Sequence, residues 1–135
     1  MSESIIDAIL KLKQKCRIEE EIGNAHGLTP RQMSCILALG DGETMSASEL
    51  SFRLGLSPSR GSRVIGGLRK KGYLDLVRDE ADKRYVMISL SGEGTACLKE
   101  LEREKSLCEA RLLEQLDADQ AEEIARHLMT LVSVL

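Results

Sequence analysis

Residues 46–90 decide the fold and read SASELSFRLGLSPSRGSRVIGGLRKKGYLDLVRDEADKRYVMISL. A capping box at residues 46–49 predicts the start of a short helix that ends near Gly55. Ser57-Pro58 predicts the start of a second helix, which Gly72 ends. Apolar and polar residues then alternate along two strands around a charged tip. The stretch therefore predicts two helices joined by a tight turn, followed by a hairpin.

The same stretch gathers the positive charge of the chain. It contains nine Lys and Arg residues against five Asp and Glu residues, whereas the remaining 90 residues contain ten against seventeen. The whole chain carries a formal net charge of −3. A basic region concentrated on an otherwise acidic chain is typical of a surface that meets a polyanion.

Residues 57–71 separate into two faces when they are placed on a helix at about 100° per residue. Four small or apolar residues are predicted to pack inward: Gly61, Val64, Ile65 and Leu68. The opposite face is short, polar and cationic, and it consists of Ser59, Ser62, Arg63, Gly66 and Lys70. Hydroxyl and guanidinium groups on such a face can donate hydrogen bonds to base edges in a major groove. We therefore predict a DNA-reading helix in which Arg63 contacts guanine and the helix N-terminus favours a phosphate.

A solvated helix is the alternative interpretation of residues 57–71. Cations near the C-terminus of any helix interact favourably with the helix dipole, and Arg69, Lys70 and Lys71 would fit that interpretation. Gly66-Gly67 argues against it, because each glycine costs about 1 kcal/mol relative to alanine in a helix interior. A surface pressed against a duplex can gain close contact from these glycines, so DNA contact is favoured.

Basic residues also cluster at or beside the tip of the predicted hairpin: Arg78, Lys83 and Arg84. An arginine on such a tip can lie along the DNA backbone or enter a minor groove, where the negative potential attracts it. Asp82 precedes Arg84 by two residues, and we expect its carboxylate to hold the arginine in a fixed pose. A loose turn of mixed charges is the alternative.

Helical periodicity continues on both sides of this stretch. Residues 3–23 are expected to form one helix, whose apolar stripe includes Ile5, Ile9, Leu12 and Cys16. A capping box at 29–32 opens another helix, which stops at 40–42. Ser91 is expected to cap a long helix, and a third capping box at 117–120 opens a terminal helix.

Composition and motifs exclude several classes of protein. The 135 residues are 42% hydrophobic and 30% charged, which indicates one soluble domain with a single core. No apolar run reaches the length of a membrane span and no cleavable signal opens the chain, so we expect a cytoplasmic protein without a membrane partner. No spacing in the sequence suits a nucleophile with its base or a metal site. We therefore expect neither an enzyme nor a cofactor or metal.

The four cysteines are Cys16, Cys35, Cys97 and Cys108, and none of them forms a C-x-x-C pair. We expect them to be reduced and to pack as small hydrophobic side chains. The alternative is a thiol redox sensor, which requires an accessible and activated thiol. Cys16 is the candidate, because its neighbours are Lys13, Lys15 and Arg17.

Five segments together resemble the MarR family of winged-helix transcriptional regulators. They are LTPRQ at 28–32, ELSFRLGLSPSRGSRVI at 49–65, LRKKGYLDLVRD at 68–79, DKR at 82–84 and LSGEG at 90–94. The DKR segment matches the D-x-R signature of the family's wing, and LSGEG is similar to its L-T-x-x-G opening of a long helix, with Ser for Thr. In element order, the resemblance covers nearly the whole chain.

The resemblance implies roles for particular residues. Ser57, Ser59, Ser62 and Arg63 would face the major groove, and Arg84, oriented by Asp82, would work at the minor groove. The first, fifth and sixth predicted helices would form a homodimer interface. Their apolar residues exceed what one small domain needs for itself, and the interface is expected to include Ile5, Ile9, Leu128, Leu131, Val132 and Leu135. Many members of the family release DNA when a small anionic ligand binds, so an inducer is left open.

The sequence therefore predicts a mainly α (α+β) fold, a winged helix-turn-helix with long N- and C-terminal dimerisation helices. Residues 28–90 would form the DNA-binding part, and residues 1–27 and 91–135 the dimerisation part. The expected function is a homodimeric repressor that binds a pseudo-palindromic operator in double-stranded DNA. Two alternatives remain open: a thiol-based redox-sensing repressor and a winged-helix protein-interaction module. The predicted DNA-binding residues are Ser46, Ser57, Ser59, Arg60, Ser62, Arg63, Lys70, Arg78, Asp82, Lys83 and Arg84.

Overall fold

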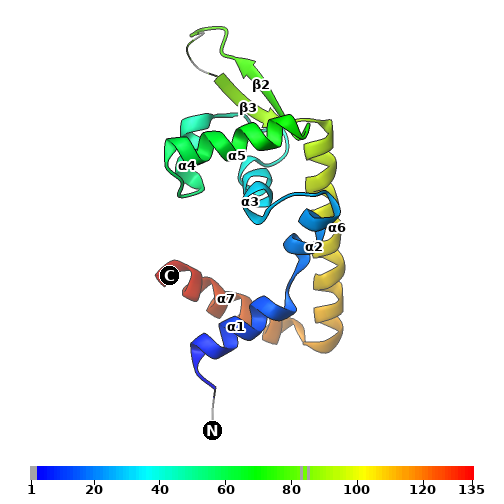
Figure 1. Cartoon of the computed structure of the whole chain (residues 1–135). Coiled ribbons are helices and arrows are strands. Elements are labelled where there is room, and N and C mark those ends of the chain that lie inside the picture. Colours follow the sequence, from blue (N-terminus) through cyan, green and yellow to red (C-terminus); the bar gives the residue numbers. More distant parts are fainter. Residues whose placement is uncertain (1–2, 83, 85) are drawn as a thin grey trace. The chain divides into compact units, whose positions relative to one another are not determined.

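The computed structural model describes residues 3–82, 84 and 86–135, and Figure 1 shows its helices and strands. Lys83, which was predicted to contact DNA, lies outside the described residues. The chain divides into two compact units, Met1–Leu101 and Glu102–Leu135. The elements, in chain order, are α1 (Ile5–Lys15), α2 (Ile18–Ala25), α3 (Pro30–Leu39), β1 (Met45–Ser46), α4 (Ala47–Arg53), α5 (Pro58–Lys70), β2 (Leu74–Arg78), β3 (Val86–Leu90), α6 (Gly92–Gln115) and α7 (Ala118–Val134).

A small antiparallel sheet in the first unit has the strand order β1-β3-β2. The hairpin of β2 and β3 has the predicted alternation, because Leu74 pairs with Leu90 and Leu76 with Ile88. Strand β1 was not predicted, since two residues are too short to produce a periodic pattern. It pairs with β3 through Met45, which faces Ile88 in the register and is buried. The third strand therefore ties the start of α4 to the hairpin.

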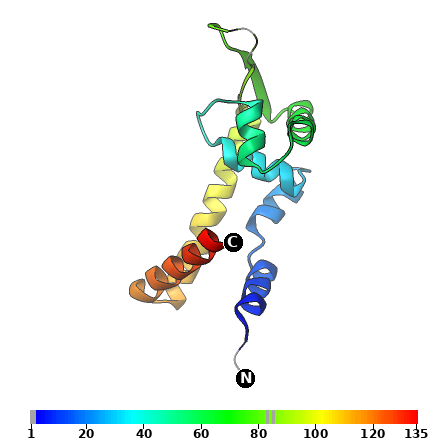
Figure 2. The ribbon, with the colours of Figure 1, turned by 90° about the vertical axis from the view of Figure 1, so that its left-hand side faces the viewer.

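The core of the first unit lies where α3, α4, α5, the sheet and the first turns of α6 meet. Aliphatic and sulfur-containing side chains fill most of it, and its fully buried members are Met33, Cys35, Ile36, Leu39, Leu50, Leu68, Ile88, Cys97 and Leu101. In two perpendicular views, the hairpin extends away from α3, α4 and α5, and α5 lies near its base (Figures 1 and 2). The fold is mainly α with one small sheet, as the sequence predicted.

The expectation of one helix over residues 3–23 is wrong, because the chain forms α1 and α2 with a break at Cys16 and Arg17. Cys16 adopts an extended conformation, with φ −97° and ψ 97°. The charges explain the break. Basic residues occupy the last turn of α1 and acidic residues the first turn of α2, and these are the charges that stabilise a helix end and a helix start. The reversal of charge is present in the sequence, but the apolar periodicity runs across it and masks the break.

In the second unit, Asp117 caps α7 by accepting a hydrogen bond from the Gln120 N–H at 2.8 Å. None of the 17 residues of α7 is buried, and the same holds for the 11 residues of α1 in the first unit. Large apolar side chains on both helices are therefore exposed, among them Ile5, Ile6, Leu10, Met129 and Val132, and so is Leu135, which follows α7. Within the described residues, no helix combines the length and the apolar character needed to cross a membrane.

Candidate nucleic-acid interface

Helix α5 begins where the sequence predicted. Gly55 has a φ of +68°, which lets the chain turn sharply after α4. The Ser57 side chain then caps α5 by accepting a hydrogen bond from the Arg60 N–H at 3.3 Å. Pro58 occupies the first turn, where its missing N–H leaves no partner unsatisfied. The Ser59 hydroxyl lies 3.4 Å from that of Ser57, so two hydroxyls gather at the helix N-terminus.

The two faces predicted for α5 are observed. Gly61, Ile65 and Leu68 are buried, and Val64 is half-buried against the core. The opposite side is exposed, and we call it the outward stripe: Ser59, Ser62, Arg63, Gly66 and Lys70. Arg60, the remaining site residue predicted on this helix, is exposed as well. The stripe offers hydroxyl and cationic donors to solvent and carries no acidic group.

Gly61 holds α5 close to α4. A Cβ atom added at this position would lie 1.8 Å from Ser51 Oγ and 2.5 Å from Ser51 Cβ. Rotation of the Ser51 hydroxyl cannot relieve the second contact, so any larger residue would push the two helices apart. The small residue therefore sets the spacing of the helix-turn-helix.

The two glycines at 66 and 67 are not equivalent. A Cβ atom at Gly67 would lie 3.0 Å from Gln32 Nε2, so packing against α3 favours a small residue there. A Cβ atom at Gly66 would meet nothing within 4 Å. A glycine at this position destabilises the helix by about 1 kcal/mol relative to alanine, and no contact within the protein requires it. Close approach to another molecule at the outward stripe would supply such a contact.

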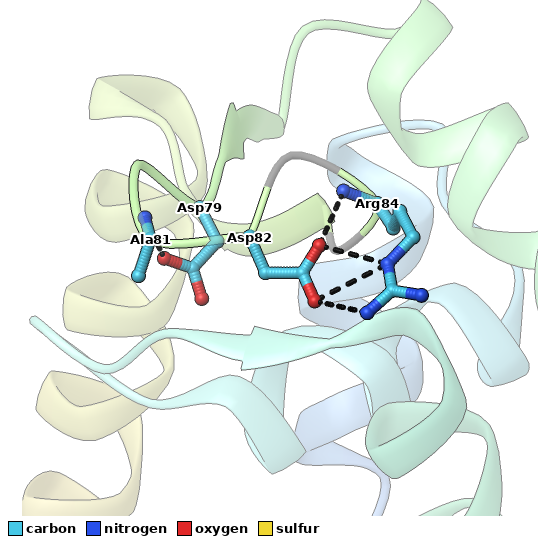
Figure 3. A network of polar contacts seen from close by, with 4 residues as sticks. All are labelled: Asp79, Ala81, Asp82 and Arg84. Atoms are coloured by element: carbon cyan, nitrogen blue, oxygen red, sulfur yellow. Dashed lines mark hydrogen bonds and ion pairs between the residues drawn. The ribbon is translucent and has the colours of Figure 1, made fainter.

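At the tip of the hairpin, the predicted pair of Asp82 and Arg84 is present (Figure 3). Arg84 Nη2 donates to Asp82 Oδ2 at 2.8 Å, and Arg84 Nε donates to Asp82 Oδ1 at 3.0 Å. The Arg84 backbone N–H also donates to Asp82 Oδ1, at 3.1 Å. Asp79 stabilises the preceding turn by accepting the Ala81 N–H at 2.9 Å. The fork-shaped contact fixes the plane of the guanidinium group, while 87% of the Arg84 side chain stays exposed.

The known proteins that this chain resembles in sequence include proteins named as transcriptional regulators. A sequence profile of the MarR family matches residues 26–84. The uncharacterized HTH-type transcriptional regulator YsmB of Bacillus subtilis (strain 168) is 34% identical over 93 residues, which are 67% of this chain and 60% of YsmB. The transcriptional repressor MprA of Escherichia coli (strain K12) is 28% identical over 111 residues, or 78% of this chain and 63% of MprA. The chain thus matches less than two thirds of the length of each curated relative.

The chain belongs to the MarR family. Its fold is a winged helix, and it superimposes on the solved structure of FabT from Streptococcus pneumoniae in complex with DNA, with a TM-score of 0.80. The two chains are 19% identical, and the match covers 96% of this chain and 94% of FabT. The hairpin of β2 and β3 is therefore the MarR wing, and α4 with α5 is the helix-turn-helix.

The other predicted DNA-binding residues lie at the base and edge of these MarR elements. Ser46 is half-buried and caps α4 by accepting the Glu49 N–H at 3.1 Å. The predicted capping box at 46–49 is formed only in this direction, because the Glu49 side chain pairs with Arg53 at 3.0 Å instead. Ser46 therefore has a structural role whether or not it contacts DNA. Arg78 is exposed at the end of β2.

Substitution of Asp82 by asparagine separates positioning from charge at the MarR wing. The Arg84 guanidinium lowers the pKa of Asp82, so the pair persists throughout neutral pH and is lost only as the pH falls through that lowered pKa. Removal of a negative charge near phosphates should by itself strengthen DNA binding. We expect Asp82→Asn to weaken operator binding by about fivefold instead, because Arg84 loses its fixed pose. Fluorescence anisotropy at constant salt measures the change.

The matched control for this variant is Glu80→Gln, which removes an exposed acidic group from the same tip. It should leave operator affinity unchanged or slightly raise it, as electrostatics alone dictates. If Asp82→Asn binds as tightly as Glu80→Gln, the carboxylate does not position Arg84 for DNA.

The four thiols occupy three kinds of environment. Cys35 and Cys97 are buried, Cys108 is half-buried and Cys16 is exposed. Burial raises the pKa of Cys35 to about 12, and burial followed by the nearby Glu100 raises the pKa of Cys97. Both groups therefore stay protonated and inert at neutral pH. No cluster of His, Cys, Asp or Glu able to hold a metal ion occurs among the described residues.

These environments predict the order in which the thiols react with an alkylating reagent. Cys16 should be modified in seconds to minutes in the native protein, whereas Cys35 and Cys97 should react only on the timescale of unfolding. Mass spectrometry of peptides from samples quenched at different times resolves the four sites. Modification of Cys35 at the rate of Cys16 in folded protein would contradict the packing described above.

A second group of contacts, which the sequence did not predict, lies at the C-terminal end of α5. Lys71 was grouped with Arg69 and Lys70 as a basic helix end, but its Nζ donates to the Gly27 carbonyl at 2.7 Å and to Gln32 Oε1 at 2.8 Å. Gln32 is buried, and its Oε1 also accepts the Thr29 N–H at 3.0 Å to complete the predicted capping box. The capping box was a signal for Gln32, but nothing local in the sequence links it to Lys71.

Proposed function

We propose that this protein is a transcriptional repressor that binds a pseudo-palindromic site in double-stranded DNA as a homodimer. The observation that carries the proposal is the outward stripe of α5, which consists of exposed hydroxyl and cationic side chains and a glycine and contains no acidic residue. Ser59, Ser62 and Arg63 would donate to base edges in the major groove, and Lys70 would contact phosphate. The N-terminus of α5, capped by Ser57, favours a second phosphate.

The wing supports the same function. Arg84 is exposed and held in a defined orientation by Asp82, which lowers the entropy that the side chain loses when it enters a minor groove. The stripe and the wing belong to one compact unit. FabT, which shares this fold, was solved in complex with DNA. Relatives named as a transcriptional regulator and a transcriptional repressor extend the support to regulation.

The exposed apolar helices support a homodimer. A helix of 17 residues with no buried side chain gains little stability from its own chain, because isolated helices of this length are marginal in water. A second copy would cover the apolar side chains of α1 and α7. Of the predicted interface residues, Ile5, Leu128, Val132 and Leu135 are exposed, and Ile9 and Leu131 are half-buried. A two-fold symmetric dimer requires a two-fold symmetric operator.

Selection of bound duplexes from a random pool tests this function. We expect recovery of an inverted repeat whose half-sites lie about one helical turn apart. Recovery of a single asymmetric half-site would contradict the homodimer, and recovery of unrelated sequences would contradict specific binding. The same selection with peroxide tests redox control, because Cys16→Ser should then abolish any release that the oxidant causes.

A further inference from the structure

Each residue of the junction between α5 and the wing makes a hydrogen bond to another part of the first unit. This junction is Lys71-Gly72-Tyr73, between α5 and β2. The Gly72 carbonyl accepts the Ser91 hydroxyl at 2.6 Å, and the Tyr73 carbonyl accepts the Ser91 N–H at 3.0 Å. Lys71 reaches back to the loop between α2 and α3 through the Gly27 carbonyl. The orientation of α5 therefore depends on contacts made at 71–73.

Three side chains complete the connection. His26, at the C-terminal end of α2, places its Nδ1 2.9 Å from the Tyr73 hydroxyl and its Nε2 2.7 Å from Glu100 Oε2 on α6. The His26 and Tyr73 rings also pack edge to face, with centroids 5.8 Å apart. We call His26, Lys71, Tyr73 and Glu100 the polar clasp. All four belong to the first unit, which ends at Leu101.

The donors and acceptors of the clasp are matched. A carboxylate only accepts, so Nε2 of His26 carries the proton that is donated to Glu100. In the neutral ring Nδ1 then accepts the Tyr73 hydroxyl proton. Burial raises the pKa of Tyr73, so the hydroxyl keeps the proton that it donates. Because Tyr73 is buried, loss of the His26 ring would remove the acceptor at 2.9 Å and leave the Tyr73 hydroxyl only the longer contact to the His26 carbonyl, at 3.5 Å.

The glycines at and near the junction do not provide rigidity themselves. Gly72 has a φ of +90°, a conformation that needs glycine, and the glycines at 66 and 67 weaken the last turns of α5. A junction of this composition needs side-chain contacts from elsewhere to fix the direction of the helix that precedes it. The clasp supplies these contacts from the end of α2 and from α6.

We propose that the polar clasp sets the angle between α5 and the first turns of α6. Through this angle, the clasp selects the spacing of the two DNA half-sites. This inference rests on the proposed homodimeric function, because only a dimer measures a spacing. These residues act through α5 and are positioning residues. A one-base-pair change in spacing rotates one half-site by about 35°, so a fixed α5 tolerates it poorly.

The test compares affinities for duplexes that carry the selected half-sites at the native spacing and at spacings one and two base pairs longer or shorter. Tyr73→Phe removes only the clasp hydroxyl. It should bind the native spacing about fivefold more weakly and should reduce the penalty for a one-base-pair shift by a similar factor. A variant that merely unfolds more easily loses the same factor on every duplex. The ratio between spacings is therefore independent of the amount of folded protein.

Glu100 provides a second, more exposed position for the same test. Glu100→Ala should flatten the spacing preference as Tyr73→Phe does, whereas Glu100→Gln keeps an oxygen that accepts the His26 proton and should restore the preference. Ser34→Ala is the matched control, since it removes one hydrogen bond of 3.0 Å, to the Pro30 carbonyl, on the exposed side of α3. It should leave the preference unchanged.

The outcomes separate this inference from the proposed function. A native protein that prefers one spacing, with Tyr73→Phe and Glu100→Ala both keeping that preference in full, overturns the role of the clasp and leaves the repressor intact. A native protein that binds every duplex alike, or none, overturns the proposed function and the inference with it. A flattened preference in both variants, restored in Glu100→Gln, supports both.

Discussion

Replacement of Gly94 by alanine is expected to lower the free energy of unfolding by about 3 kcal/mol or more. A Cβ atom at this position would lie 2.3 Å from the Tyr73 carbonyl oxygen, about 1 Å closer than a tight C···O contact allows. The carbonyl cannot withdraw freely, because it accepts the Ser91 N–H at 3.0 Å. Nor can Gly94 move away easily, because its own N–H donates to the Ser91 hydroxyl at 3.2 Å. The methyl group therefore strains α6 and the junction at once.

The first turn of α6 provides a matched control. Gly92→Ala places a Cβ atom where nothing lies within 4 Å, so the substitution should change the free energy of unfolding by less than about 1 kcal/mol. Urea titrations of the native protein and both variants, at one protein concentration because a dimer is expected, measure the difference. Equal stabilities of Gly94→Ala and Gly92→Ala would show that α6 does not meet the junction as described.

The second large effect is expected at Arg63. Arg63→Ala should weaken binding to the selected operator by about 1–3 kcal/mol, which is the discrimination that a bidentate contact to guanine provides. Binding to a random duplex should fall much less, because that affinity comes from phosphate contacts. Arg63 is exposed on α5 and no core contact depends on it, so the free energy of unfolding should stay within about 0.5 kcal/mol of the native value.

Lys70 provides the comparison for Arg63, because it is a cation on the same stripe, seven residues further along α5. Lys70→Ala should weaken binding to operator and random duplex by the same factor. It should also lower the number of counterions released on binding by about one, as measured by the slope of log affinity against log salt concentration. Titrations of both variants on both duplexes at several salt concentrations separate the two roles. If the two variants lose affinity equally on operator and random duplex, Arg63 does not read sequence.

Local signals in the sequence predicted most of the fold. Caps at Ser57, Thr29 and Asp117 and the alternation in the hairpin each depend on neighbouring residues, and all of them are present. The inward and outward faces of α5 also follow from periodicity alone. These features are predictable because each lies within one turn of helix or one pair of strands.

Contacts between distant segments could not be predicted in this way. His26 and Tyr73 are separated by 47 residues, and His26 and Glu100 by 74, so no periodic pattern relates them. The reason for Gly61 lies in Ser51, on another helix. The sequence identified Asp82 and Arg84 as a pair because they are only two positions apart. The DNA-contacting roles of the whole set, and the division of the chain into DNA-binding and dimerisation parts, remain predictions.

The most direct test of the central claim follows the resonances of the ¹⁵N-labelled protein as the selected operator is added. The account predicts the largest chemical-shift changes at the backbone amides of residues 57–70 and at the Nε–H of Arg84, which Asp82 holds in the free protein. Changes that concentrate in α1 and α7 and leave α5 and the wing unaffected would contradict DNA binding by the outward stripe and the wing.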